Sequence, residues 1–564
     1  MTPRILYFTI FPLVWIAGWA LLAGVSFQTQ PFAVGEESRY LSLAWTLWRD
    51  GGFLHTGLGP DGALVVWPML VWIIDFGWLM FGVSDWWPHL LGYSAGLFSV
   101  LLTAGLARLL WPGWAGLGAM SGTALSASVV WLIISGYLGP FVVATAFVLA
   151  SLYSLAWYWR TGRWDGYVYF GLFMGGSVLT IGPVGWLIAI PVALLAPLWG
   201  GALAEQIDDD RRPPQGWRQW YVACAIAWAI SLAMVIAWAG FGILEVSGKD
   251  LPFLDAASTF GSSLMPDRYE VRRLWWCVLI GVGAVVVPWM MWMPAWRSLV
   301  GLKHLAMDGG ARLCVMWLVF GAAPIIMFSG MNPVFAALAL PPVSLLLAFL
   351  VFYRADKEAV EPVEERRFGS GETTLGLVLV VCGAVLLVAP FAGEVFDIPV
   401  WVAQMDGGWG SLVILLGALV AYAAPRLVDL RMMIVSVVSI MVVVVGHLVA
   451  EPITRTYFDP RPAADYVTEQ LSQGNRIAFA GEYAGQFDFP ARLEKSIVVL
   501  PDDDPIGRAA WIAGSPGAII VSVMDHVPTE PPPLASFPYG SRNMVFWLGN
   551  VMTVNPSLLD ERGP

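Results

Sequence analysis

Two adjacent carboxylates stand in a stretch of the sequence that is otherwise poor in charge. Glu36 and Glu37 are followed by Ser38, Arg39 and Tyr40, soon after an apolar run that ends near residue 25. A carboxylate near a membrane surface, beside apolar walls, can bind a metal ion or accept a proton from a hydroxyl or amine nucleophile. The alternative is a helix N-terminus, where acidic residues favour the positive end of the helix dipole. Both interpretations stay open from the residues alone.

A second group of charged residues runs from Asp267 to Arg273, directly before Trp275 and Trp276. Its cations could face the same cavity as Glu36, or they could anchor the chain at the membrane edge, where such residues are frequent. The three cations are Arg268, Arg272 and Arg273.

Two isolated polar residues carry weaker signals. His89 stands at the outer end of an apolar run beside Trp86 and Trp87, and is either an interfacial side chain or part of a binding site. Asp75 lies inside another apolar run, and we expect its carboxylate to point to water if that run lies at the interface. Histidines and cysteines are scattered without metal-ligand spacing.

The composition is that of a membrane protein. Of 564 residues, 58% are hydrophobic and only 13% are charged, about half the share typical of soluble domains. The 31 tryptophans fit a membrane–water interface. A spanning helix needs about 20 apolar residues, which predicts a polytopic α-helical membrane protein with about thirteen transmembrane helices. We expect them near 6–25, 89–108, 114–135, 140–159, 166–184, 185–200, 219–243, 274–295, 313–330, 334–353, 373–392, 409–424 and 432–450.

The distribution of Lys and Arg sets the topology. The first run, Leu6 to Val25, is long enough to span and lacks a clear cleavage site, so we interpret it as a retained anchor rather than a signal peptide. With the N-terminus inside, most Lys and Arg fall on the cytoplasmic side. Counting Ala63 to Gly82 as a further span would reverse this bias, so that run is predicted to lie along the outer interface or to re-enter. The first loop, residues 26–88, is then periplasmic.

The C-terminal segment changes character after about residue 450. A helical stretch from Ala463 to Leu471 is followed by short apolar runs rich in β-forming residues. We therefore predict a membrane domain over 1–450 and a small periplasmic α/β domain over 451–564. The four runs are Arg476–Ala480, Ser496–Leu500, Ala518–Val523 and Met544–Trp547.

Several short motifs occur together and in order in the first 200 residues. They are Glu36-Glu37-Ser38-Arg39-Tyr40, Val66-Trp67-Pro68-Met69-Leu70-Val71-Trp72, Phe81-Gly82-Val83-Ser84, Trp87-Pro88-His89-Leu90 and Leu179-Thr180-Ile181-Gly182-Pro183. As a set they resemble the GT-C type polyprenyl-phosphate-sugar glycosyltransferases. The aminoarabinose transferases and protein O-mannosyltransferases (glycosyltransferase family 39-like) are the most similar. In that family the corresponding motifs are Asp-Glu-x-Arg-Tyr, Lys-Pro-Pro-Leu-x-Tyr-Trp, Phe-Gly-x-Ser, Arg-Leu-Pro and Leu-Thr-Lys-Gly-Pro.

The chain departs from the family at several positions. Glu36 replaces the first catalytic Asp, His89 replaces an Arg, and Val66 and Ile181 each replace a Lys. The stretch from Ser135 to Pro140, where the family has a second acid, holds no carboxylate. In the family these cations are expected to hold the phosphate leaving group, and a buried phosphate without cations is costly. The expected replacements are a divalent metal ion or the cations Arg39, Lys249, Arg268, Arg272 and Arg273.

The resemblance implies a membrane glycosyltransferase. It would move a sugar from a polyprenyl-phosphate donor to a lipid, glycan or protein acceptor at the outer face of the cytoplasmic membrane. Glu36 would act as base or metal ligand and Glu37 would support it, with Arg39, Tyr40 and His89 near the substrate. We expect membrane lipids, but no nucleic acid, as further partners. The alternative is a catalytically degenerate homologue that serves as a binding or scaffold subunit in envelope-glycan assembly. A secondary transporter is less favoured because internal repeats are absent from the sequence.

Overall fold

The computed structural model is mostly helical and divides into two compact units. The helical unit comprises Met1–Ser26, Leu90–Gly136 and Pro140–Val449, and the mixed unit comprises Phe27–His89, Tyr137–Gly139 and Ala450–Pro564. The structure describes residues 6–32, 35–50, 67–114, 116–205, 216–245, 287–322, 337–358, 372–392, 400–422, 428–481, 483–500 and 504–559.

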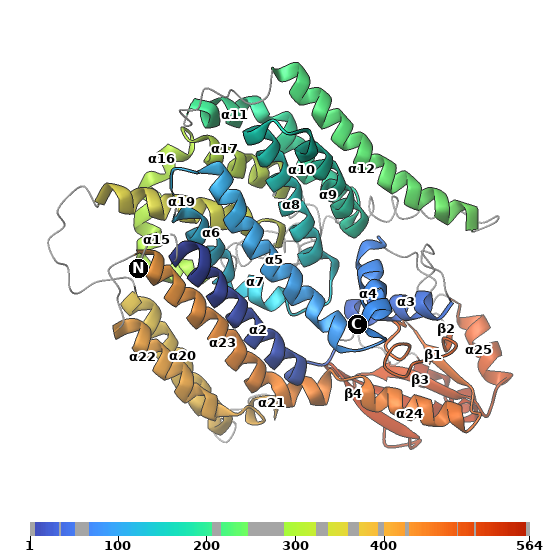
Figure 1. Ribbon diagram of the computed structural model, residues 1–564. Coiled ribbons are helices and arrows are strands. Elements are labelled where there is room, and N and C mark those ends of the chain that lie inside the picture. The colour runs from blue at the N-terminus through green and yellow to red at the C-terminus, as the bar shows by residue number, and fades with distance from the viewer. Residues whose placement is uncertain are drawn as a thin grey trace. The chain divides into compact units, whose positions relative to one another are not determined.

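Within the described residues, the helical unit is built from α-helices with short 3₁₀ and π segments between them (Figure 1). The ends of α2, α5 and α23 belong to the mixed unit. The elements are η1 (Leu6–Ile10), α2 (Phe11–Thr29), α5 (Trp86–Leu110), α6 (Leu117–Ser126), α7 (Val129–Ile134), α8 (Pro140–Thr161), α9 (Trp164–Ile181), α10 (Val184–Leu194), α11 (Ala196–Glu205), α12 (Trp217–Glu245), η2 (Trp289–Met291), α15 (Met293–Ser298), η3 (Leu299–Gly301), α16 (Leu302–Leu305), α17 (Gly309–Met316), η4 (Trp317–Ala322), α19 (Leu340–Glu358), α20 (Glu372–Ala392), α21 (Val400–Ala403), η6 (Gly407–Trp409), α22 (Gly410–Tyr422) and α23 (Val428–Tyr457).

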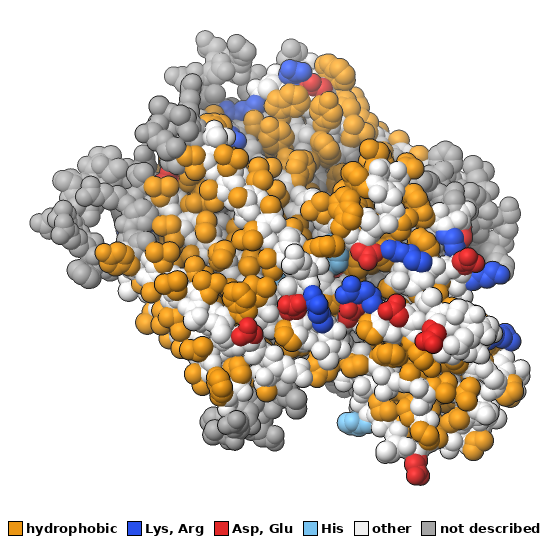
Figure 2. Space-filling view, turned by 60° about the horizontal axis from the view of Figure 1, so that its bottom comes forward, with side chains coloured by type: hydrophobic (Ala, Val, Ile, Leu, Met, Phe, Trp, Pro, Cys, Tyr) orange, Lys and Arg blue, Asp and Glu red, His pale blue; other side chains and the backbone are white. Residues whose placement is uncertain are grey.

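Six helices of the described chain are long and apolar enough to cross a membrane, or seven if the bent pair α10–α11 counts as one span. The chain is therefore a multi-pass membrane protein, while the count of thirteen spans stays a prediction. Leu377, Val381 and Val385 are exposed at helical spacing on α20, as expected of a lipid-facing surface. Figure 2 shows hydrophobic side chains over much of the visible surface. The six helices are Tyr7–Thr29, Trp86–Leu110, Pro140–Thr161, Trp217–Gly240, Thr373–Phe391 and one within Val428–Ser472.

Close helix pairs in the helical unit depend on small residues. Helices α20 and α22 lie side by side, and a Cβ added at Gly383 would stand 2.7 Å from the backbone oxygen of Gly410 (Figure 1). Gly376 and Gly417 meet in the same way about two helical turns away, on the same face of α20. Glycine lets helix backbones approach this closely, which increases van der Waals contact where the hydrophobic effect does not drive association.

The mixed unit combines helices with one five-stranded sheet of order β2-β1-β3-β5-β4. β1 pairs in parallel with β2 and β3, whereas β5 pairs antiparallel with β3 and β4. Its elements are α3 (Glu36–Asp50), α4 (Met69–Phe81), α24 (Arg461–Ser472), β1 (Ile477–Ala480), β2 (Val498–Leu500), α25 (Pro505–Ala513), β3 (Ile519–Met524), β4 (Ala535–Tyr539), β5 (Arg542–Leu548), α26 (Gly549–Val554) and η7 (Pro556–Leu559).

Alternate residues of the central strands enter two separate cores, one on each face of the sheet. Phe479, Val521 and Phe546 pack with α24 on one face. Ala478 and Trp547 belong to the core that α25 and α26 cover on the other face. The four predicted β-rich runs overlap β1, β2, β3 and β5, and the predicted helix overlaps α24.

The α20–α22 contact predicts that one added methyl group destabilises the protein at Gly383 but not at Gly446. Gly383→Ala should lower the melting temperature in detergent by several degrees, because overpacking against backbone costs about 1–3 kcal/mol. Gly446→Ala on α23 is the matched control, since among the described residues no atom beyond its chain neighbours and its own helix backbone lies within 4 Å of its added Cβ. Equal melting temperatures for the two variants would show that α20 and α22 do not meet as described.

Candidate functional site

Helix α3 carries the predicted acidic pair at its first turn. Gly35, with φ of 114°, precedes it and accepts the Arg39 N–H through its carbonyl. Such a positive φ is accessible to glycine at little cost, so Gly35 lets the chain turn sharply into the helix. Consecutive side chains of a helix point in directions about 100° apart. Glu36 is accordingly exposed and Glu37 is buried.

Glu37 binds the backbone of the stretch from Ser135 to Pro140, which holds no carboxylate of its own. Its Oε1 accepts the backbone N–H of Leu138 at 2.5 Å, in a contact that is buried. A buried carboxylate that accepts a backbone N–H fixes the position of its helix and satisfies the amide. Glu37 therefore fixes the start of α3 to Tyr137–Gly139, and this points to a positioning role. Its predicted catalytic role stays a prediction.

Arg39 is exposed, and the next residue of α3, Tyr40, is buried. Burial, reinforced by the charge of Glu36, raises the pKa of the Tyr40 hydroxyl well above its usual range. Tyr40 is therefore neutral and packs on the buried side of α3, whereas Glu36 is the exposed acid of the pair.

The middle of α3 is fixed by a buried carboxylate from the C-terminal part of the chain. Ser42 Oγ donates to Asp488 Oδ2 at 2.5 Å, and the Tyr483 hydroxyl donates to Asp488 Oδ1 at 2.9 Å. Asp488 is 1% exposed, and burial raises the pKa of its carboxyl, partly offset by these two hydrogen bonds and by the charge of Arg49. Burial and Asp488 likewise raise the pKa of Tyr483.

An aromatic cluster around Phe489 extends this attachment to α4. The Phe489 ring stacks on Trp78 of α4, with centroids 5.1 Å apart and planes 6° apart, and it meets Trp45 of α3 edge-on. The Arg492 guanidinium lies 3.7 Å from the Phe489 centroid, a cation–π distance. Trp45 Nε1 also donates to the Leu493 carbonyl at 2.9 Å. Residues 488–493 therefore hold both first-loop helices.

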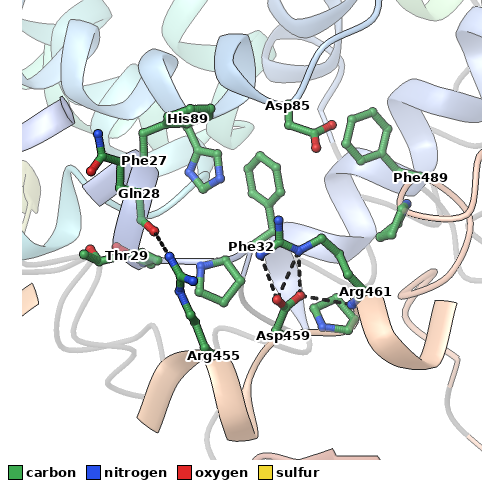
Figure 3. A pocket seen from close by; sticks show the side chains of 14 residues that line it. Phe27, Gln28, Thr29, Phe32, Asp85, His89, Arg455, Asp459, Arg461 and Phe489 are labelled. Carbon is green, nitrogen blue, oxygen red and sulfur yellow. Dashed lines mark hydrogen bonds and ion pairs between the residues drawn. The ribbon is translucent and has the colours of Figure 1, made fainter. Parts of the chain in front are cut away.

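His89 lies in a separate cavity of about 230 Å³ within the mixed unit (Figure 3). The Phe32 ring stacks on the imidazole at 3.8 Å, and Arg455, Asp459 and Arg461 line the same cavity. None of Glu36, Glu37, Arg39 or Tyr40 is among the lining residues, so the structure does not bring His89 together with the acidic pair. The full lining is Phe27, Gln28, Thr29, Gln30, Pro31, Phe32, Asp85, His89, Arg455, Asp459, Pro460, Arg461, Phe489 and Pro490.

The sequence interpretation missed the charged part of this cavity. Glu451, Arg455, Asp459 and Arg461 follow the last apolar run within eleven positions, at the point where the chain changes composition. That alternation of charges was the available signal. It shows a charged segment but does not reveal that the segment returns to residues 27–32.

Other predicted residues have different outcomes. The expectation that Asp75 points to water is wrong, because it is 1% exposed and its Oδ1 has no hydrogen-bond partner in the described chain. Arg268, Arg272 and Arg273 lie outside the described residues. The described residues contain no group of three His, Cys, Asp or Glu that could hold a metal ion. The predicted role of Glu36 as a metal ligand stays a prediction.

Comparison with solved structures identifies the fold. ArnT from Cupriavidus metallidurans bound to undecaprenyl phosphate superposes with a TM-score of 0.66 at 16% identity, over 95% of this chain and 97% of ArnT. The apo state of that ArnT gives 0.64 at 17% identity, over 96% and 98% of the two chains. The chain has the ArnT fold. The predicted resemblance to GT-C glycosyltransferases is therefore confirmed for the fold.

Curated sequences point in the same direction over part of the chain. An undecaprenyl phosphate-alpha-4-amino-4-deoxy-L-arabinose arabinosyl transferase from Pseudomonas paraeruginosa (strain DSM 24068 / PA7) is 25% identical over 337 residues, 56% of this chain. An uncharacterized protein from Aquifex aeolicus (strain VF5) is 30% identical over 154 residues, 27% of this chain. The matches span 54% and 30% of these relatives, respectively. No family model matches.

The Asp488 attachment predicts a large loss of stability on truncation. Asp488→Ala leaves the Ser42 and Tyr483 hydroxyls buried without their acceptor, which should cost about 2–4 kcal/mol. The matched control is Asp525→Ala, which removes an exposed pair with Arg542 and should cost less than about 1 kcal/mol. The measurement is thermal unfolding of both variants in detergent. Equal losses of stability in the two variants would contradict the role of Asp488 in fixing α3.

The raised pKa of Asp488 predicts how stability changes with pH. The carboxyl ionises near pH 4 in the unfolded chain but only at higher pH in the folded protein. Its contribution is therefore complete below about pH 4 and is lost as the pH rises through the folded-state value. The stability of the wild type relative to Asp488→Asn should fall as the pH is raised from 4. A stability difference between the wild type and Asp488→Asn that stays constant or grows with pH would contradict a raised pKa of Asp488.

Proposed function

We propose that the chain is a membrane glycosyltransferase that moves a sugar from a polyprenyl-phosphate donor to a lipid, glycan or protein acceptor. The supporting observation is Glu36, an exposed carboxylate at the first residue of α3, in a chain that has the fold of a transferase solved with undecaprenyl phosphate. The name of the curated relative from P. paraeruginosa, a transferase of a sugar carried on undecaprenyl phosphate, points to the same donor class.

In the proposed topology, thirteen helices cross the cytoplasmic membrane and the N-terminus lies inside. The first loop, 26–88, and the α/β domain at 451–564 then lie in the periplasm. This arrangement puts α3 where a lipid donor keeps its isoprenoid tail in the bilayer while its head group reaches the helix. The positive-inside distribution of Lys and Arg supports this orientation.

The reaction that fits one exposed carboxylate is a single displacement with inversion. Glu36 accepts the proton of the acceptor hydroxyl or amine as that atom bonds to the anomeric carbon of the sugar. The bond from the anomeric carbon to the phosphate oxygen breaks, and polyprenyl phosphate leaves with the electron pair. Arg39, exposed one turn later on α3, offsets the negative charge on the departing phosphate together with Arg268, Arg272 and Arg273.

Glu37, Tyr40 and Asp488 have a different part in this proposal. They position α3 through the contacts with Leu138 and Ser42 and by burial of its inner face. Precise placement of a base contributes to rate because the reacting atoms must meet at about 3 Å. Their replacement should therefore slow transfer without changing the chemistry.

Replacing Glu36 tests the assignment directly. Glu36→Gln should reduce transfer by about 10²–10⁴-fold, the usual contribution of a general base. Glu36→Asp should retain part of the activity, since it keeps a carboxylate one methylene shorter. The assay follows release of polyprenyl phosphate from a panel of polyprenyl-phosphate sugars by mass spectrometry, with exposed Glu494→Gln as the control. Full activity in Glu36→Gln would refute the assigned role, whereas no release of polyprenyl phosphate by the wild type from any donor of the panel would favour the degenerate scaffold subunit.

A further inference from the structure

A second cavity, of about 250 Å³, lies in the helical unit where two of the long apolar helices end. Leu110 in its wall is the last residue of the span Trp86–Leu110, and Arg160 is the last residue but one of the span Pro140–Thr161. The end of an apolar span marks the boundary of the hydrocarbon core, where phospholipid headgroups lie. The cavity is partly open to the surface, and its small volume suits a headgroup but not acyl chains.

Arg160 brings a positive charge to this cavity. Its Nε donates to the Leu109 carbonyl at 2.6 Å and its Nη2 to the Leu110 carbonyl at 3.3 Å, which joins the ends of α8 and α5. Both acceptors are neutral, and within the described part of the chain no carboxylate forms an ion pair with Arg160. Because an arginine has five N–H groups, up to three of them can bind a ligand. A guanidinium binds the oxygens of a phosphate well, often two at a time.

Asp308 brings the opposite charge to the same wall. It is 7% exposed and precedes α17, where its Oδ1 accepts the Ala311 N–H at 2.7 Å and the Trp111 Nε1–H at 2.8 Å. These contacts fix the carboxylate at the cavity. A ligand with negative charge alone would be attracted by Arg160 and repelled by Asp308. A ligand that carries both an anionic and a cationic group meets a group of opposite sign for each.

Trp114 forms an aromatic part of the wall. It is half-buried, and its ring stacks against Phe349 and Phe352 of α19, with centroids 5.6 and 5.2 Å apart. Tryptophan is frequent at the level of the lipid headgroups, and the face of its ring attracts cations. The ring therefore adds to the preference for a ligand with an ammonium group at this depth of the membrane.

We propose that this cavity binds the headgroup of a phospholipid that carries a phosphodiester and a primary ammonium group, as in phosphatidylethanolamine. The phosphate oxygens accept hydrogen bonds from Arg160, and the ammonium group lies against the Asp308 carboxylate. A primary ammonium has three N–H donors for this carboxylate, whereas the quaternary ammonium of choline has none. The acyl chains stay in the bilayer. This assignment is independent of the proposed function, because it uses none of the residues placed around Glu36.

The test measures binding of three lipids to the full chain in detergent by native mass spectrometry and by thermal shift. The lipids are phosphatidylethanolamine, phosphatidylcholine and phosphatidylglycerol with the same acyl chains, so that only the headgroup differs. Phosphatidylethanolamine should bind about tenfold more tightly than the other two, the effect of one charge-assisted hydrogen bond. Millimolar inorganic phosphate should not displace it, because phosphate has neither the ammonium group nor the acyl chains.

Two conservative variants locate the binding. Arg160→Gln keeps a donor for the α5 carbonyls and should weaken phosphatidylethanolamine binding about tenfold. Asp308→Asn keeps an oxygen that caps α17 and should abolish the preference for phosphatidylethanolamine over phosphatidylglycerol. The matched controls are Arg163→Gln and Asp165→Asn, which remove the same charges from an exposed pair that is not part of the cavity wall. Both controls should bind as the wild type does.

Equal affinities of the wild type for the three lipids would overturn the proposal, and this comparison needs no variant to fold. Undiminished binding in Arg160→Gln together with an unchanged preference in Asp308→Asn would place the lipid elsewhere and would also overturn it. Displacement by inorganic phosphate would show a site for free phosphate and refute the lipid assignment. Melting temperatures of the lipid-free variants within a few degrees of the wild type exclude misfolding as the cause of lost binding.

Discussion

The hydrogen bonds that Ser42 and Tyr483 donate to Asp488 are the interactions on which the rest of the mixed unit depends. They join a first-loop helix to a segment more than four hundred residues later, inside a core where an unpaired hydroxyl or carboxylate would be costly. Phe489 follows directly and packs against Trp45 and Trp78, so the polar attachment and the aromatic cluster reinforce each other. With α3 fixed in this way, Glu37 is turned inward and Glu36 outward. The exposure of one acid of the pair is thus a consequence of the attachment.

Much of the fold follows from local pattern. The apolar runs that lie within described residues form helices, and four β-rich runs became strands, because hydrophobic period and β-propensity act over a few residues. Strand β4 was missed because Ala535–Tyr539 contains Pro538 and lies at the sheet edge, where proline is tolerated. Helix α25 was missed because Pro505 and Gly507 suggest a turn, whereas Pro505 is at the first helical turn and Asp504 caps the Gly507 N–H.

The candidate site was less predictable, since its contacts join residues far apart in the chain. The motif around Glu36 located the acids but could not tell which one is buried, because that depends on Leu138, 101 positions away. The absence of a carboxylate from 135–140 was interpreted as a lost catalytic group. The structure shows that the backbone of this loop binds Glu37. Asp75 was expected at the surface because apolar helices near an interface usually turn acids to water, yet it is buried. In each case tertiary packing decided what local sequence left open.

The central claim is that the start of α3 faces the non-cytoplasmic side of the membrane, where a polyprenyl-phosphate head group is accessible. The most direct measurement is labelling of Arg39→Cys with a membrane-impermeant maleimide, in a chain whose four native cysteines are replaced by serine. Because residue 39 is exposed on α3, the thiol can be reached without unfolding. The account predicts labelling in intact spheroplasts. Labelling that requires permeabilised membranes would place α3 in the cytoplasm and contradict it.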